Sequence, residues 1–147
     1  MNIFKEIHYL IDKLVYKSIN SKSKKWNRIM RDYYKNYSLI FTDCDAYCTI
    51  YEGLIYFKKE IFLHPTEEDL FDLLHEIGHC ETNTEEMIDC EGEYLATQWA
   101  IDNMDKYNVV VSRKYIDEYQ DYIFDWWYDD KRNKKKVPTK KSLRLVY

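Results

Sequence analysis

Residues 66–80, "TEEDLFDLLHEIGHC", decide the fold that we expect for this 147-residue chain. Thr66 is a good N-cap, and Asp69 occupies the position of the acidic partner in a capping box. Apolar residues recur at helical spacing on one side, namely Leu70, Leu73, Leu74 and Ile77. The stretch therefore predicts an amphipathic helix from residue 66 to about residue 80.

Two histidines, His75 and His79, lie in this helix in the pattern HExxH. Residues at i and i+4 share a helix face about 5–6 Å apart at Cβ, so both imidazoles can bind one ion. Glu76 lies beside that face, where its carboxylate can reach a water on the metal instead of the metal. The pattern predicts a zinc site with His75 and His79 as ligands and Glu76 as general base. Two histidines without a metal, exposed or packed in the core, are the alternative.

Two further residues of this helix bear on the site. Gly78 is unfavourable in a helix interior by about 1 kcal/mol relative to Ala, so we expect the backbone of another element to approach it closely. Asp72 lies three residues before His75 on the same face. It is a candidate to orient an imidazole by a hydrogen bond, although a solvated acid is the commoner role.

A catalytic zinc needs a third protein ligand, and the next helix offers Asp89, Glu91 and Glu93. At 100° per residue Asp89 and Glu93 are about 40° apart on one face, whereas Glu91 points away. Glu93 lies about 10 Å into that helix, level with the histidines if the two helices pack antiparallel. We expect Glu93 to be the third ligand, with Glu91 and Asp89 as alternatives. His64 and His8 are the remaining imidazoles.

"LLHEIGHC" followed by "EGEYLATQWAI" resembles the ImmA/IrrE-type metallopeptidases, which are gluzincin-like zinc proteins. These proteins pair an HExxH helix with a glutamate helix of the form E-x-x-A-x-x-W-A, which falls here on Glu93, Ala96, Trp99 and Ala100. The similarity covers roughly residues 54–105. The resemblance implies a zinc endopeptidase of a phage or mobile element, often acting on a separate helix-turn-helix repressor.

The function that we predict is hydrolysis of a peptide bond in a specific protein substrate, such as a repressor or another regulator. In this scheme a metal-activated water attacks the peptide carbonyl, and Glu76 takes its proton. The alternative is a regulatory binding protein that zinc stabilises and that cleaves nothing.

The rest of the chain predicts helices on either side of a small sheet. Residues 37–64 are rich in β-branched and aromatic residues, so we expect three or four short, mostly antiparallel strands. Helices are expected at residues 3–18, 25–36, about 86–104 and about 114–129. This order predicts an α+β fold with N-terminal helices, an HExxH helix packed on the glutamate-bearing helix, and a C-terminal helix.

Charge divides the chain unevenly. Residues 37–130 carry five Lys and Arg against 23 acids, whereas residues 131–147 carry eight Lys and Arg and no acid. We expect a single metallopeptidase-like domain at residues 1–130, followed by a basic C-terminal tail at residues 131–147 that is solvated and frayed. Contact between basic segments and nucleic acid is the alternative, and no recognisable nucleic-acid-binding motif supports it.

The sequence favours a cytoplasmic protein without a membrane partner. The first 18 residues carry charges every few positions, unlike the apolar segment of a signal peptide. No run approaches the apolar length of a membrane span. In the cytosol the cysteines are expected to be reduced, with a Cys80–Cys90 disulfide as the less favoured alternative.

Overall fold

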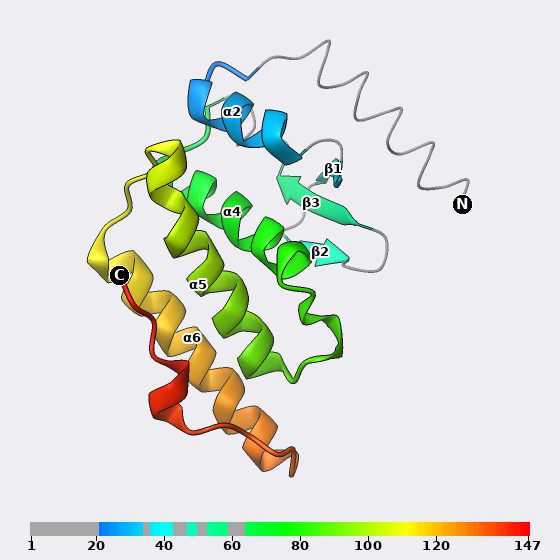
Figure 1. Ribbon diagram of the computed structural model, residues 1–147, viewed down its shortest axis with the longest axis vertical. Helices are drawn as coiled ribbons and strands as arrows, with labels where there is room; N and C mark the ends of the chain where they lie inside the picture. Colours follow the sequence, from blue (N-terminus) through cyan, green and yellow to red (C-terminus); the bar gives the residue numbers. More distant parts are fainter. Residues whose placement is uncertain (1–20, 34–35, 43–46, 50–52, 59–63) are drawn as a thin grey trace, which may run out of the picture.

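Four α-helices and three short strands make up the described part of the chain. The computed structural model describes residues 21–33, 36–42, 47–49, 53–58 and 64–147. The helices are α2 (Lys24–Tyr33), α4 (Glu67–Glu81), α5 (Asp89–Tyr107) and α6 (Arg113–Arg132). The strands are β1 (Ser38–Thr42), β2 (Tyr47–Thr49) and β3 (Leu54–Lys58), and the 3₁₀ helices are η2 (Thr84–Glu86) and η3 (Lys140–Leu143). Helix α5 lies between α4 and α6 (Figure 1).

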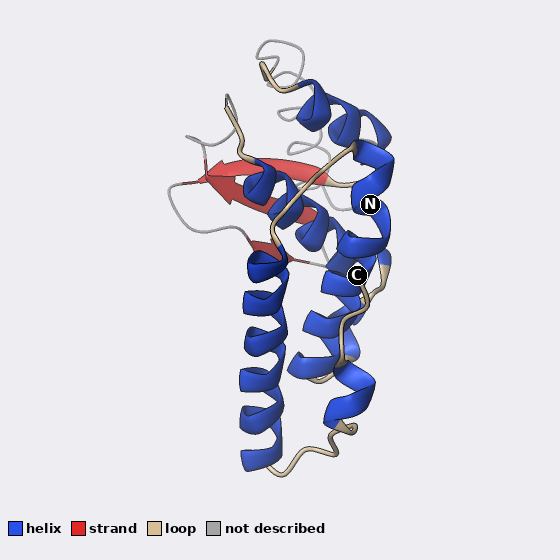
Figure 2. Ribbon diagram, turned by 90° about the vertical axis from the view of Figure 1, so that its left-hand side faces the viewer, coloured by secondary structure: helices blue, strands red, loops and turns tan. Residues whose placement is uncertain are grey.

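The three strands form a small mixed sheet in the order β1-β3-β2. Strand β1 pairs in parallel with β3, with Ser38 opposite Leu54, and β2 pairs antiparallel with β3, with Tyr47 opposite Tyr56. The sheet contacts α4 on the side away from α5 (Figure 1). Figure 2 shows the strands together on one side of the molecule, with helices above and below them.

The prediction of an α+β fold with a mostly antiparallel sheet is wrong. The described residues are mostly helical, the strands have five, three and five residues, and the pairing of β1 with β3 is parallel. Strand composition indicates where strands form but not how they pair, because pairing depends on packing between distant residues. Among the side chains that the structure describes, most of the buried apolar core lies on helices, and β3 contributes Leu54, Ile55 and Phe57.

The helices follow the local signals closely. Helix α4 has the predicted cap: the Asp69 amide donates to Thr66 Oγ1 at 3.1 Å, and the Thr66 amide donates to Asp69 Oδ2 at 2.8 Å. Helix α2, predicted at residues 25–36, spans Lys24–Tyr33 and buries Trp26, Ile29 and Met30. The helix predicted at residues 3–18 lies outside the described residues.

Helix α5 begins later than predicted, because residues 84–86 form η2 instead. Its N-cap residue, Ile88, has no side chain that can accept a hydrogen bond. Asp130 of α6 takes this role, because its buried carboxylate accepts from the Cys90 amide at 2.9 Å. The first turn of α5 is thereby attached to the last turns of α6.

The C-terminal segment packs against α5 and α6, so its interpretation as a frayed tail is wrong. Leu143 and Leu145 are buried. The Gln120 side chain donates to the Leu143 carbonyl at 2.9 Å and accepts from the Leu145 amide at 2.8 Å. Gln98 binds both backbone groups of Val146 at 2.9 Å. The side-chain amides of two glutamines therefore bind backbone groups of the segment, as the backbone of a neighbouring strand would do in a sheet.

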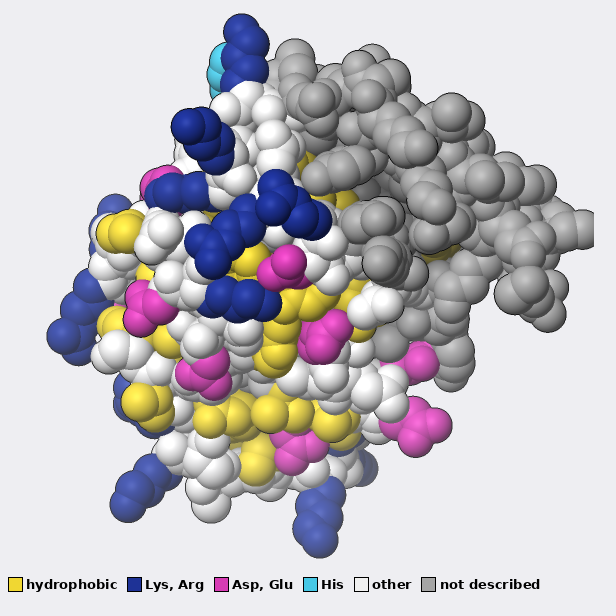
Figure 3. Space-filling view, turned by 45° about the horizontal axis from the view of Figure 1, so that its top comes forward, with side chains coloured by type: hydrophobic (Ala, Val, Ile, Leu, Met, Phe, Trp, Pro, Cys, Tyr) yellow, Lys and Arg dark blue, Asp and Glu magenta, His cyan; other side chains and the backbone are white. Residues whose placement is uncertain are grey.

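Basic side chains gather at the end of the molecule that α2 forms (Figure 3). Lys24, Arg28 and Arg31 of α2 are exposed there, as is Lys106 near the end of α5. Lys106 forms an ion pair with Asp32 at 3.0 Å.

None of the described helices combines the length and the apolar character that crossing a bilayer requires.

Candidate metal centre

Helix α4 presents His75 and His79 one turn apart on the face toward α5. His75 is 4% exposed, and the side chain of His79 is 12% exposed. Their ring centroids are 4.6 Å apart. Because α4 is continuous from Glu67 to Glu81, the two imidazoles keep the spacing that the HExxH pattern predicts.

Helix α5 lies close to α4 at Gly78, as predicted from the glycine. A Cβ at Gly78 would stand 2.6 Å from the Ala96 carbonyl oxygen and 3.1 Å from the Ala96 Cα. Ala96 and Ala100 are fully buried, so small residues on both helices allow the approach. Glu93 precedes Ala96 by about one turn of α5, and this contact brings its side chain level with the histidines.

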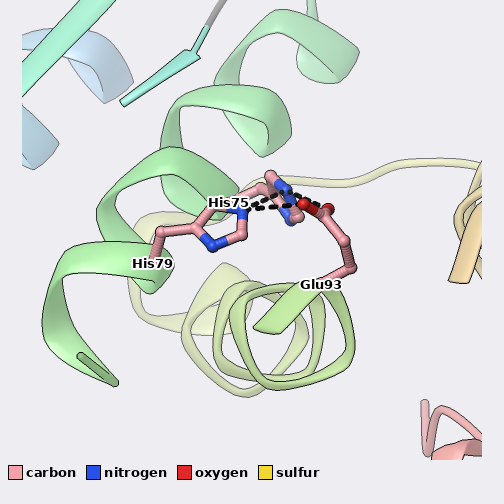
Figure 4. A group of neighbouring side chains, drawn as sticks. All are labelled: His75, His79 and Glu93. Atoms are coloured by element: carbon pink, nitrogen blue, oxygen red, sulfur yellow. Dashed lines mark hydrogen bonds and ion pairs between the residues drawn. The ribbon is translucent and has the colours of Figure 1, made fainter. Parts of the chain in front are cut away.

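The three side chains converge on one point (Figure 4). The Glu93 carboxylate lies 3.3 Å from His75 Nε2 through one oxygen and 3.4 Å from His79 Nε2 through the other. The two Nε2 atoms are 3.1 Å apart. These residues form a group that could hold a metal ion.

Thr97 determines which nitrogen of His75 carries the proton. The Thr97 hydroxyl donates its one hydrogen to the Glu93 carbonyl at 2.7 Å, so toward His75 Nδ1, at 3.2 Å, it acts as the acceptor. His75 therefore carries a proton on Nδ1, and the lone pair of Nε2 points toward His79 and Glu93. Thr84 holds the other ring in a similar way, with its hydroxyl 2.9 Å from His79 Nδ1.

Electrostatics in the site favour a cation among the three groups. Burial by itself raises the pKa of Glu93, but hydrogen bonds to the two histidines lower that pKa to about 2. Burial lowers the pKa of His75, yet its hydrogen bond to Glu93 and the charge of Glu76 raise the pKa overall. Glu93 is thus held ionised, and its charge favours a cation beside it, either a proton on His75 or a metal ion.

Glu76 is buried beside this group and is 8% exposed. Its charge acts on His75 and also on Tyr119 and Tyr122 of α6. Glu76 thus places a buried negative charge close to His75. The HExxH pattern predicts this residue as the general base.

Asp72 does not bind an imidazole in the described contacts. Its Oδ1 accepts from the Tyr115 hydroxyl at 2.5 Å and from the Tyr119 hydroxyl at 2.6 Å. Burial raises the pKa of Asp72, although both hydroxyls lower it. Tyr119 then packs its ring 5.0 Å from that of His75. Asp72 thus acts on His75 through its charge and through the tyrosine that it holds.

The alternative third ligands lie elsewhere. Asp89 forms an ion pair with Lys135 at 2.8 Å, and its side chain is 48% exposed. Glu91 is half-buried and does not belong to the group, and His64 is exposed. His8 lies outside the described residues. Among the described residues, Glu93 is the acid that the structure brings to both histidines.

Sequence reasoning missed Thr84, Thr97 and Tyr119. Thr97 follows Glu93 by four residues, so helical periodicity alone places it on the Glu93 face. The positions of Thr84 and Tyr119 beside the histidines depend on how η2 and α6 pack, for which the sequence carries no local signal.

Cys80 and Cys90 are free thiols, as expected, and Cys44 lies outside the described residues.

Comparison with known protein families, curated proteins and solved structures finds no match for this chain.

Proposed function

We propose that the protein is a zinc-dependent endopeptidase that hydrolyses a peptide bond in a specific protein substrate. The observation that carries this proposal is the convergence of His75 Nε2, His79 Nε2 and the Glu93 carboxylate within 3.1–3.4 Å of one another. The adjacent buried Glu76 supplies the general base that a purely structural site does not need.

The spacing of these atoms fits zinc. Tetrahedral zinc binds nitrogen and carboxylate oxygen at about 2.0–2.1 Å, which separates neighbouring ligand atoms by about 3.3 Å. The separations of 3.1, 3.3 and 3.4 Å match this value without rearrangement. Two imidazoles and one carboxylate are also the ligand set of catalytic zinc in several peptidases, and they leave the fourth position for water or substrate.

The protein residues have distinct roles in this reaction. Bound zinc supplies a Lewis acid that activates water at neutral pH and polarises the peptide carbonyl. Glu76 accepts the proton of the attacking water and delivers it to the leaving amine nitrogen. Thr97 accepts the Nδ1 proton of His75 and so keeps its Nε2 lone pair directed at the metal, while the hydrogen bond between Thr84 and His79 Nδ1 holds the second ring in place.

The substrate class follows from the sequence resemblance to the ImmA/IrrE-type metallopeptidases. In those proteins the partner is often a repressor with a helix-turn-helix domain. We therefore propose a separate regulatory protein as substrate. The pattern of Glu93, Ala96, Trp99 and Ala100 supports this assignment, since Ala96 forms the close contact with α4 at Gly78.

The experiment that tests catalysis compares the zinc-loaded wild type with Glu76→Gln on a pool of peptides derived from a cell proteome. Mass spectrometry then identifies newly formed peptide termini. Glu68→Gln, an exposed change on the same helix, is the matched control. Zinc content is measured for all three proteins.

We expect new termini with the wild type and with Glu68→Gln, and none with Glu76→Gln at equal zinc content. Equal cleavage by Glu76→Gln would contradict its role as base. Zinc binding without any cleavage by the wild type would favour a regulatory protein that binds its partner without cutting it.

A further inference from the structure

A pocket of about 240 Å³ opens on α6 and is lined by Tyr115, Glu118, Tyr119 and Tyr122. Tyr119 also forms the wall of the metal centre, since its ring lies 5.0 Å from that of His75. Because Tyr119 belongs to both, the pocket adjoins the metal centre.

The aromatic walls of the pocket are fixed in orientation. The hydroxyls of Tyr115 and Tyr119 both donate to Asp72 of α4. The two rings pack edge to face at 5.6 Å, and Phe71 packs against each of them. Because the hydroxyls are bound to Asp72, the rings contribute π-surface to the pocket instead of hydrogen-bond donors. Such a surface favours a cation.

One acidic side chain lines the pocket. Glu118 belongs to its lining, and its side chain is 60% exposed. Its ion pair with Lys114 is 3.9 Å long, and the lysine side chain is 87% exposed, so this partner is readily displaced. The pocket thus combines tyrosine faces with the carboxylate of Glu118, and its lining includes no basic residue.

We propose that this pocket binds a lysine or arginine side chain of the peptide substrate next to the scissile bond. This inference rests on the proposed function. The aliphatic part of such a side chain packs on the tyrosine rings, while its charged end reaches Glu118. An acidic side chain would be repelled, and an aliphatic one would lack the charge interaction. The proposed substrate site is therefore basic at one position beside the cleaved bond.

The test uses hydroxamates, which bind zinc through their own oxygens and need no cleavage. One probe carries a lysine side chain, and the other carries norleucine, which is the same chain without its ammonium group. Both are prepared with the side chain on either side of the hydroxamate, so that both directions along the peptide are sampled. Acetohydroxamate serves as the probe without a side chain. Binding to the zinc-loaded protein is measured by titration calorimetry.

We expect the lysine probe to bind about tenfold more tightly than the norleucine probe in one of the two forms. In Glu118→Gln the preference should fall to about threefold or less, and Tyr122→Leu should also reduce it. Asp121→Asn removes the same charge from the next turn of α6 outside the pocket lining, and should leave the preference unchanged.

Two results would overturn the inference. The first is equal binding of the lysine and norleucine probes in both forms. The second is a lysine preference that Glu118→Gln does not reduce relative to Asp121→Asn. Failure of acetohydroxamate to bind would instead count against the zinc site itself, and so against the proposed function on which the pocket depends.

Discussion

The contact between Gly78 and Ala96 makes the metal centre sensitive to a single methyl group. In Gly78→Ala the new Cβ would lie 2.6 Å from the Ala96 carbonyl oxygen, whereas ordinary contact begins at 3.4 Å. Helices α4 and α5 must therefore separate locally by about 0.8 Å. The obstacle is backbone, so no change of rotamer relieves it. Glu93 moves with α5, and His75 and His79 stay with α4.

The expected effect is larger on zinc binding than on folding. Overpacking of this kind destabilises by about 1–3 kcal/mol, and replacing Gly by Ala in a helix returns about 1 kcal/mol. The free energy of unfolding should therefore fall by about 0–2 kcal/mol. Metal ligands must lie within about 0.5 Å of their working positions, and a separation of about 0.8 Å exceeds this limit. The affinity for zinc should therefore fall at least about tenfold.

Competition with a chromogenic zinc chelator measures this affinity, and chemical denaturation measures stability. Gly92→Ala is the matched control, because its new Cβ would meet a Thr84 side-chain atom at 3.3 Å rather than backbone. This variant should bind zinc within about threefold of the wild type. Zinc binding by Gly78→Ala as tight as that of Gly92→Ala would refute the claim that the close helix approach positions Glu93.

Three further outcomes follow from the contacts of the site and of the α5 N-terminus. Thr97→Val removes the acceptor for the His75 Nδ1 proton and should weaken zinc binding by about 10–100-fold in the chelator competition, whereas Thr97→Ser should restore it. Asp130→Ala leaves the buried Cys90 amide without its acceptor, and denaturant unfolding should show a loss of about 1–3 kcal/mol with zinc affinity little changed. In the metal-free protein the pKa of Glu93 is lowered from 4.5 to about 2, so its stabilisation is present above pH 4.5 and is lost as the pH falls toward 2. The pKa of His75 is raised above 6.5, so its stabilisation is present below pH 6.5 and is lost as the pH rises through the raised pKa. The melting temperature of the metal-free protein should therefore be highest between about pH 4.5 and pH 6.5. It should decline at lower pH, where Glu93 is protonated, and at higher pH, where His75 loses its proton.

Local patterns in the sequence account for much of the site. The i and i+4 spacing of His75 and His79 depends only on a continuous helix, and Thr66 and Asp69 mark where that helix begins. Gly78 likewise indicates the close approach of α5, because a glycine inside a helix needs a steric reason. These features are decided within one or two turns, where sequence periodicity is informative.

Features that depend on packing between distant residues were not predictable in this way. The parallel pairing of β1 with β3 depends on chain topology, and strand composition does not specify it. The charges of residues 131–147 predict a frayed terminus, yet Leu143 and Leu145 are buried, and Gln98 of α5 and Gln120 of α6 bind the backbone of this segment. The role of Tyr119 beside His75 depends in the same way on the position of α6.

Zinc content tests the central claim most directly. The wild type, Glu93→Ala and Glu91→Ala are purified side by side, supplied with zinc, desalted and measured by inductively coupled plasma mass spectrometry. Glu91 is the matched control, because it is the same residue two positions away on α5 and lies outside the group. We predict about one zinc per chain in the wild type and in Glu91→Ala, and a large loss in Glu93→Ala. A wild type without zinc, or a Glu93→Ala variant that keeps the full amount, would contradict the account.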